Sequence, residues 1–261
     1  MDVKPRLGVI GGGRLAEGIA KTWLARTGQA PLIWSRNGPR DSRISEATWI
    51  TRWTGTLEAE SVVIAIPGRA LLDLAEGNEQ ARQFTGNIFS AAASLSHASL
   101  QQVFPQATIV CIAPFLIDGV NSIPLIALRP ANLSDSEWTN AKAALDDFGN
   151  CDVVEDEAVF ARMYLLGAAW PAVVLAAVRA AADAGVQGLP DEAAMKLGKQ
   201  IFLRGIHSLL NAETSSEIAT RSEIATPGGI TERGLKSLGE VTLLFDSVFQ
   251  QMQARAEELR A

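Results

Sequence analysis

The chain has few of the residues on which metal centres, disulfide frameworks and nucleophilic catalysis depend. Its 261 residues include two cysteines, Cys111 and Cys151, and two histidines. The cysteines lack the spacing of metal ligands, and no cluster of histidine, cysteine and carboxylate stands out in the sequence, so we expect no metal site. No serine or cysteine has the sequence setting of a nucleophile. Because no secretory signal pattern follows Met1, the expected compartment is a reducing cytoplasm.

Positive charge is also scarce. The 23 lysine and arginine residues are outnumbered by 29 aspartate and glutamate residues, which gives a net charge of −6 at pH 7. The sequence has no cluster of basic residues that would neutralise the phosphates of a nucleic acid, so nucleic acid is not expected as a partner. The longest apolar run, residues 165–178, is interrupted by Pro171 and followed at once by Arg179, so no membrane span is expected. A hydrophobic content of 48% suffices for the core of one large or two modest domains.

A glycine-rich turn near the N-terminus is the most informative motif. Residues 7–10 form a short apolar run that leads into three consecutive glycines, and a helical pattern of apolar residues follows. The spacing Gly11-x-Gly13-x-x-Ala16 fits a dinucleotide-binding fingerprint, with glycines for a tight turn and for close approach of a pyrophosphate. The N–H groups at the start of the helix would face the phosphates. A plain glycine-rich connector is the alternative.

The residues after the second expected strand, 31–34, indicate which dinucleotide binds. An NAD site usually has an acidic residue here to accept hydrogen bonds from the ribose, but this chain has Ser35 and Arg36. A hydroxyl and a guanidinium group suit a 2′-phosphate, so NADPH is the expected cofactor. The alternative for Arg36 is a solvated surface arginine. The expected cofactor-binding residues follow three strands: Gly11, Gly13, Arg14, Leu15, Ser35, Arg36, Asn37, Ala65, Ile66 and Pro67.

Strands and helices alternate through the first part of the chain. Further strands are expected at 61–66, 87–89, 108–112, 123–128 and near 153–154, and helices at 95–104 and 134–148. The second of these helices opens with Ser134-x-x-Glu137, a capping box. The alternation predicts right-handed crossover units in a doubly wound α/β sheet of the Rossmann type, with a nucleotide-binding domain at residues 1–155.

The pattern changes near residue 155. No convincing strand follows, and alanine-rich helices are expected around 157–185, 190–211 and 231–258. Residues 156–261 are therefore expected to form an all-α domain, and its small residues would permit close helix packing at a subunit interface.

With both halves in view, the chain resembles the pyrroline-5-carboxylate reductase family over nearly its whole length. Thr226-Pro227-Gly228-Gly229-Ile230-Thr231 is similar to the family's Ser-Pro-Gly-Gly-x-Thr signature. The resemblance implies a homodimer or higher homo-oligomer in which the helical domain forms the dimer and active sites are shared between subunits. The physics of the turn agrees, because free N–H groups at Gly229, Ile230 and Thr231, beside Gly228, would bind a substrate carboxylate. A simple capped turn is the alternative.

Departures from the family pattern predict a different substrate. The family's lysine is missing from Ala65-Ile66-Pro67-Gly68, and Ile112-Ala113-Pro114-Phe115 lacks its pocket asparagine. Its Ser-Gly-Ser-Gly-Pro aligns with Gly167-Ala168-Ala169-Trp170-Pro171, so two serines are lost and Trp170 adds a bulky indole to the expected substrate pocket. Fewer hydrogen-bonding groups and more apolar surface predict a substrate other than the usual small proline precursor.

Reduction of an imine also requires a proton for nitrogen. The candidate catalytic hydroxyls are those of Tyr164, which replaces a family threonine, and of Thr231. Tyr164 could instead be a core aromatic residue. His97 has no acidic partner in sequence, and we interpret it as a helix-end residue.

Three functions remain open from the sequence. The first is an NADPH-dependent reductase of a carboxylate-bearing, cyclic imine. The second is a β-hydroxyacid-type dehydrogenase, although no lysine lies between Lys142 and Lys196 where its helix-borne lysine would be needed. The third is a non-catalytic NADPH-binding protein.

Overall fold

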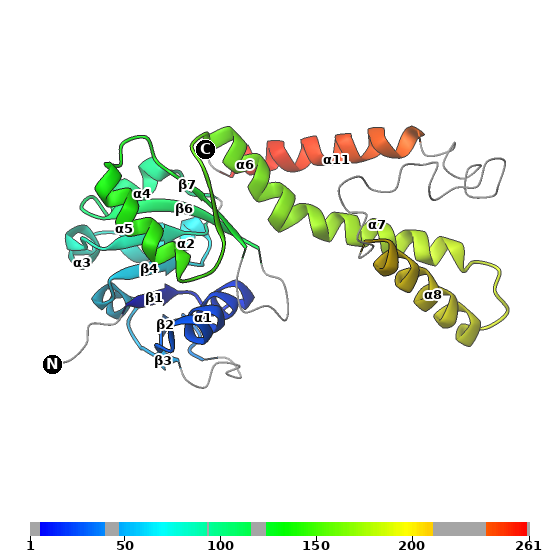
Figure 1. The fold of residues 1–261 in the computed structure, drawn as a ribbon, viewed down its shortest axis with the longest axis horizontal. Helices are drawn as coiled ribbons and strands as arrows, with labels where there is room; N and C mark the ends of the chain where they lie inside the picture. Colours follow the sequence, from blue (N-terminus) through cyan, green and yellow to red (C-terminus); the bar gives the residue numbers. More distant parts are fainter. Residues whose placement is uncertain (1–5, 40–46, 93, 116–123, 211–238, 260–261) are drawn as a thin grey trace. The chain divides into compact units, whose positions relative to one another are not determined.

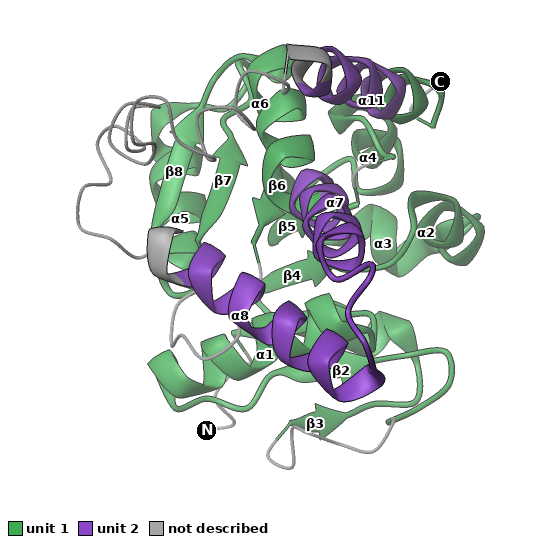
Figure 2. Ribbon diagram, turned by 90° about the vertical axis from the view of Figure 1, so that its right-hand side faces the viewer, with its two compact units in different colours: residues 1–168, 254–261 green, residues 169–253 purple. Residues whose placement is uncertain are grey.

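The computed structural model describes residues 6–39, 47–92, 94–115, 124–210 and 239–259. The chain forms two compact units (Figure 2), one of residues 1–168 with 254–261 and the other of residues 169–253. The domain division expected from the sequence, 1–155 and 156–261, stays a prediction.

The first unit is built on a sheet whose described strands follow the order β3-β2-β1-β4-β5-β6-β7-β8 (Figure 1). The strands are β1 (Leu7–Ile10), β2 (Leu32–Trp34), β3 (Thr48–Trp49), β4 (Ser61–Ile64), β5 (Asn87–Ser90), β6 (Thr108–Pro114), β7 (Leu125–Leu128) and β8 (Cys151–Val154). All neighbouring pairs are parallel except β6 and β7. The predicted fold class, an α/β sheet followed by a helical region, is confirmed.

The antiparallel β7 corrects the expectation of crossover units throughout. Only residues 115–124 connect β6 to β7. A parallel crossover needs a dozen or more residues and usually a helix, so this short connection returns the chain antiparallel to β6.

The longest helices of the described residues lie in the second half of the chain: α7 (Trp170–Gly185), α8 (Glu192–Leu210) and α11 (Gly239–Glu258). The other helices of the described residues are α1 (Arg14–Thr27), the 3-10 helix η1 (Trp53–Glu58), α2 (Gly68–Ala75), α3 (Glu79–Gln83), α4 (His97–Val103), α5 (Asp135–Asp146), α6 (Glu157–Tyr164) and the π-helical segment η2 (Leu165–Ala169). The sequence predictions missed β3, η1, α2 and α3, which have eight residues or fewer and are shorter than the window of about 11–18 residues over which a period is counted. The start expected near Thr231 for the last helix lies outside the described residues.

Each face of the sheet carries its own apolar cluster. On one face α1 and α5 pack over Trp23, Phe89 and Phe148, whose rings meet with centroids 5.2 Å (Trp23–Phe148) and 6.3 Å (Phe89–Phe148) apart. On the other face η1, α2, α3, α4 and α6 enclose Phe84 and Phe104. Alternate residues of each central strand enter opposite clusters, which explains why these strands read as continuous apolar runs.

The predicted capping box at Ser134 is present at the start of α5. Ser134 Oγ accepts a hydrogen bond from the Glu137 backbone N–H at 3.3 Å, and the Glu137 carboxylate accepts one from the Ser134 N–H at 2.9 Å. The reciprocal bonds satisfy donors that a helix start leaves unpaired.

The second unit is helical. Asp183 of α7 and Lys199 of α8 form an ion pair. Trp170, at the start of α7, packs edge-on against Phe245 and Phe249 of α11, with ring centroids 5.6 and 5.3 Å away.

One helical stretch in the described part of the chain, Glu157–Gly185, is long and apolar enough to cross a membrane by length and composition alone. An 18-residue window within it has a mean hydropathy of 1.7, and 11% of that window is buried. A helix that covers its apolar face with a partner subunit meets the same criteria.

Candidate functional site

The glycine turn after β1 is held between the ends of two neighbouring strands. The Gly11 N–H donates to the Trp34 carbonyl at 2.8 Å, and the Ala65 N–H donates to the Ile10 carbonyl at 2.9 Å. Gly11 has a φ of +140°, which favours glycine, and a Cβ there would lie 2.6 Å from the Ala65 carbonyl oxygen. The turn therefore requires glycine at this position.

The next two glycines have different surroundings. A Cβ at Gly12 would lie 2.6 Å from Ser35 Oγ, whereas a Cβ at Gly13 would meet no heavy atom within 4 Å. Gly13 is the N-cap of α1, and no side chain caps the helix there. An uncapped helix N-terminus beside open space is suited to bind an anion.

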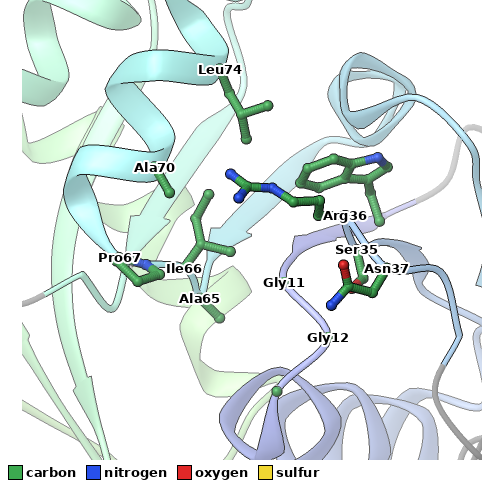
Figure 3. A pocket seen from close by; sticks show the side chains of 12 residues that line it. Gly11, Gly12, Ser35, Arg36, Asn37, Ala65, Ile66, Pro67, Ala70 and Leu74 are labelled. Atoms are coloured by element: carbon green, nitrogen blue, oxygen red, sulfur yellow. The ribbon is translucent and has the colours of Figure 1, made fainter.

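These segments line one pocket of about 390 Å³ at the carboxyl ends of β1, β2 and β4 (Figure 3). The lining residues are Gly11, Gly12, Gly13, Trp34, Ser35, Arg36, Asn37, Ala65, Ile66, Pro67, Ala70 and Leu74. Eight of the ten residues expected to bind the cofactor are among them. Arg14 and Leu15 begin α1 and are not among the lining residues.

Arg36 provides the positive charge of this pocket. Its side chain is exposed, and its guanidinium group extends across the pocket toward Ala70 and Leu74 of α2 (Figure 3). Ser35 and Asn37 lie beside the glycine turn. The arrangement offers a guanidinium, a hydroxyl and an amide to a phosphate group at one end of the pocket.

The sequence reasoning missed four lining residues: Gly12, between the two predicted glycines, and Trp34, Ala70 and Leu74. Trp34 ends β2 directly before Ser35, so its position at the strand end was a usable signal. Ala70 and Leu74 lie four residues apart on α2, on one face of that helix. They were missed because α2 itself was not predicted.

Tyr164 lies at the neighbouring part of the same sheet edge. Its hydroxyl donates to the Ala91 carbonyl at 3.4 Å, and the Ala91 N–H donates to the Ile64 carbonyl at 3.0 Å. Ala91 is thereby fixed next to Ala65. Tyr164 is not among the residues that line the pocket of Arg36, but it lines a smaller cavity together with Ser90, Cys111 and Glu157.

His97 is the first residue of α4, as expected for a helix-end residue. Partial burial lowers the pKa of its imidazole below the ordinary value of 6.5. A hydrogen bond with the Ile109 backbone and the charge of Glu157 act in the opposite direction. The balance favours the neutral imidazole.

The expected substrate-binding residues are only partly described. Trp170 lies in the aromatic contact with Phe245 and Phe249. Gly228, Gly229, Ile230 and Thr231 lie outside the described residues. Their roles in substrate binding and catalysis stay predictions.

Comparison with known proteins gives a consistent result. Residues 157–259 match the family model for pyrroline-5-carboxylate reductase dimerisation. The chain is 26% identical to a pyrroline-5-carboxylate reductase from Synechocystis sp. over 269 residues, covering 97% of this chain and 98% of that protein.

Solved structures share the fold. The Plasmodium falciparum pyrroline carboxylate reductase with NADP bound has a TM-score of 0.78 at 14% identity, covering 98% of each chain. An imine reductase variant from Myxococcus stipitatus in complex with NAD+ has a TM-score of 0.54 at 17% identity, covering 98% of this chain and 93% of that one.

Proposed function

Because the chain belongs to the pyrroline-5-carboxylate reductase family, we propose that it is an NADPH-dependent reductase of a carboxylate-bearing cyclic imine. The observation that carries the proposal is the pocket in which the glycine turn, Arg36 and the Ala65–Pro67 segment converge. Each of these follows a different strand, and ligands of doubly wound sheets bind at this edge.

The residues of the pocket fit NADPH. The glycine conformation at Gly11 and the open side of Gly13 make room for a pyrophosphate at the start of α1. The exposed Arg36 and the Ser35 hydroxyl suit the 2′-phosphate. When bound, NADPH supplies the hydride that reduces the C=N bond.

The protein's own groups complete the reaction. We expect the segment of Gly228, Gly229, Ile230 and Thr231 to hold the substrate carboxylate through backbone N–H groups and the threonine hydroxyl. Tyr164, whose hydroxyl lies at the carboxyl edge beside Ala91, donates a proton to the imine nitrogen or orients it. Trp170 adds apolar surface to the substrate side.

A homo-oligomer with shared active sites is part of the proposal. Large apolar side chains remain exposed on the helices that match the dimerisation model, among them Ile201 of α8 at 61% and Leu243 of α11 at 70%. Exposed apolar surface of this kind marks an interface, here with a second copy of the chain. We expect Ile201→Lys with Leu243→Lys to give monomers in light scattering after size exclusion, while NADPH binding persists. Unchanged assembly would contradict the proposed interface.

The test of the activity separates it from the two alternatives. The purified chain is incubated with NADPH and a panel of cyclic imino acids and 2-ketoacids, and cofactor oxidation is followed as the loss of NADPH absorbance. A separate titration measures NADPH binding by fluorescence. Turnover of cyclic imino acids supports the proposal. Turnover of ketoacids alone would favour the dehydrogenase, and binding without turnover would favour the non-catalytic protein.

A further inference from the structure

Phe115 and Gly167 interlock at the carboxyl edge of the sheet. A Cβ added at Gly167 would lie 1.9 Å from Phe115 Cε1, 2.2 Å from Cδ1 and 2.5 Å from Cζ. The phenyl ring therefore fills the space that any side chain at position 167 would need. The two positions are coupled, because a side chain at 167 requires the ring to move.

The positions of Phe115 and Gly167 would affect a ligand bound at this edge of the sheet. Phe115 directly follows β6, and its N–H donates to the Pro124 carbonyl at 2.9 Å, which fixes its backbone. Gly167 belongs to the π-helical segment η2, and π-helical turns occur frequently at functional sites.

Phe115 continues an apolar row along the sheet edge. Ile66 follows β4, Ala92 follows β5 and Phe115 follows β6, and all three pack, partly buried, against the same cluster on one face of the sheet. Ile66 also lines the pocket of Arg36. The row therefore begins at the proposed cofactor pocket and runs toward β6.

The order of the strands shows which end of this row lies near the phosphate of a bound dinucleotide and which end lies near its reacting group. Arg36, the glycine turn and Ala65 follow β2, β1 and β4, and β5 and β6 come next in the sheet. A ligand with a phosphate at Arg36 that crosses the glycine turn extends toward β5 and β6. The reacting end of the site therefore falls beside Ala92, Tyr164 and Phe115.

We propose that Phe115, whose ring occupies the space that a side chain at Gly167 would need, is a specificity-determining residue. It selects cyclic imines that carry a hydrocarbon substituent on the imine ring. The inference rests on the proposed function. A polar substituent against the phenyl ring would lose its hydrogen bonds to water without replacement, whereas a hydrocarbon group would be buried favourably. In apolar pockets, one methylene already changes selectivity by about 10- to 200-fold.

The test compares pyrroline-5-carboxylate with the same ring carrying a phenyl group. We expect the wild type to give a kcat/KM ratio of at least about 10 in favour of the phenyl compound. Phe115→Ala removes the wall and should lower that ratio about 10-fold, and Phe115→Leu, which keeps an apolar side chain, should retain most of it. Gly167→Ala displaces the ring and should also lower the ratio.

The double variant tests the coupling itself. In Phe115→Ala the added methyl at position 167 has room, so Gly167→Ala should have little further effect there. Effects that multiply independently, or a ratio that no variant changes, would overturn the inference.

Binding provides a readout that does not depend on turnover. Thermal shifts of the NADPH-loaded protein are measured with proline and with phenyl-substituted proline, and the wild type should be stabilised more by the phenyl compound. NADPH affinity serves as the folding control, since Phe115 does not line the cofactor pocket. If neither imine is reduced, the proposed function fails, while the difference in thermal shift between wild type and Phe115→Ala still decides the role of Phe115.

Discussion

Gly11 packs directly against the backbone carbonyl of Ala65, because the ends of β1 and β4 are joined by the hydrogen bond from the Ala65 N–H to the Ile10 carbonyl. A methyl group at position 11 would overlap that carbonyl and would also have to adopt a φ of +140°. We expect Gly11→Ala to lower the free energy of unfolding by about 1–3 kcal/mol and to abolish NADPH binding. Urea denaturation and fluorescence titration measure the two effects.

Gly13→Ala is the matched control. A methyl group there has open space and a φ of −87° that alanine adopts, so the fold should lose no more than about 1 kcal/mol, the cost of a poorer N-cap. NADPH affinity should still fall, because the methyl group occupies the side from which a pyrophosphate approaches. Equal effects of the two substitutions on stability, or full NADPH affinity in Gly13→Ala, would contradict this account of the turn.

The parts of this site that could be predicted from the sequence are those formed by residues close together in the sequence. The strand, turn and helix from Leu7 to Thr27 follow from local patterns, an apolar run and glycines at fixed spacing, and the start of α5 follows from Ser134 and Glu137. Residues that are neighbours in the sequence determine these features, so they could be predicted without the structure.

The features that the sequence did not predict depend on contacts between distant segments. The direction of β7 is set by the short connection from β6, and β3 has only the residues Thr48–Trp49, which pair with β2. The contact between Phe115 and Gly167 joins segments that sequence spacing cannot relate. Both positions were noted as departures from the family pattern, but only the structure shows that they depend on each other.

Arg36 should determine the choice between NADPH and NADH. Its guanidinium group extends into the pocket, and hydrogen bonds to a charged group contribute about 1.5–3 kcal/mol. We expect Arg36→Gln to weaken NADPH binding about 10- to 100-fold and to leave NADH binding nearly unchanged. The wild-type preference for NADPH should also decrease as salt is raised.

Arg52→Gln is the control for this charge change. Arg52 is exposed and does not line the pocket. Its substitution removes the same charge from the chain, so any loss of NADPH affinity in Arg52→Gln comparable with that in Arg36→Gln would show that the effect is not specific to the 2′-phosphate.

The Tyr164 hydroxyl makes a long hydrogen bond and has a proposed role as proton donor. One substitution can distinguish its effect on stability from its effect on catalysis. Its hydrogen bond to the Ala91 carbonyl is 3.4 Å long, so Tyr164→Phe should cost no more than about 1 kcal/mol of stability. If the hydroxyl donates the proton, kcat should fall by about 100-fold or more, with NADPH affinity unchanged. Unchanged turnover together with an unchanged pH profile would assign the tyrosine to the core alone.

His97 should make the stability of the fold sensitive to mild acid. Partial burial lowers the pKa of its imidazole below 6.5, so the unfolded chain binds the proton more tightly than the native protein does. The native state is therefore favoured above the ordinary histidine pKa and loses this advantage as the pH falls below about 6.5.

We expect His97→Gln to reduce the difference between the free energies of unfolding at pH 7.5 and pH 5.5. The other histidine, His207, provides the comparison, because it lies on α8 and is exposed. Urea denaturation of His97→Gln and His207→Gln at both pH values measures the effect, and NMR titration of the His97 ring measures its pKa directly. If His207→Gln removes as much of the pH dependence as His97→Gln, or if the His97 ring titrates at or above 6.5, burial does not control the protonation of His97 in the native state.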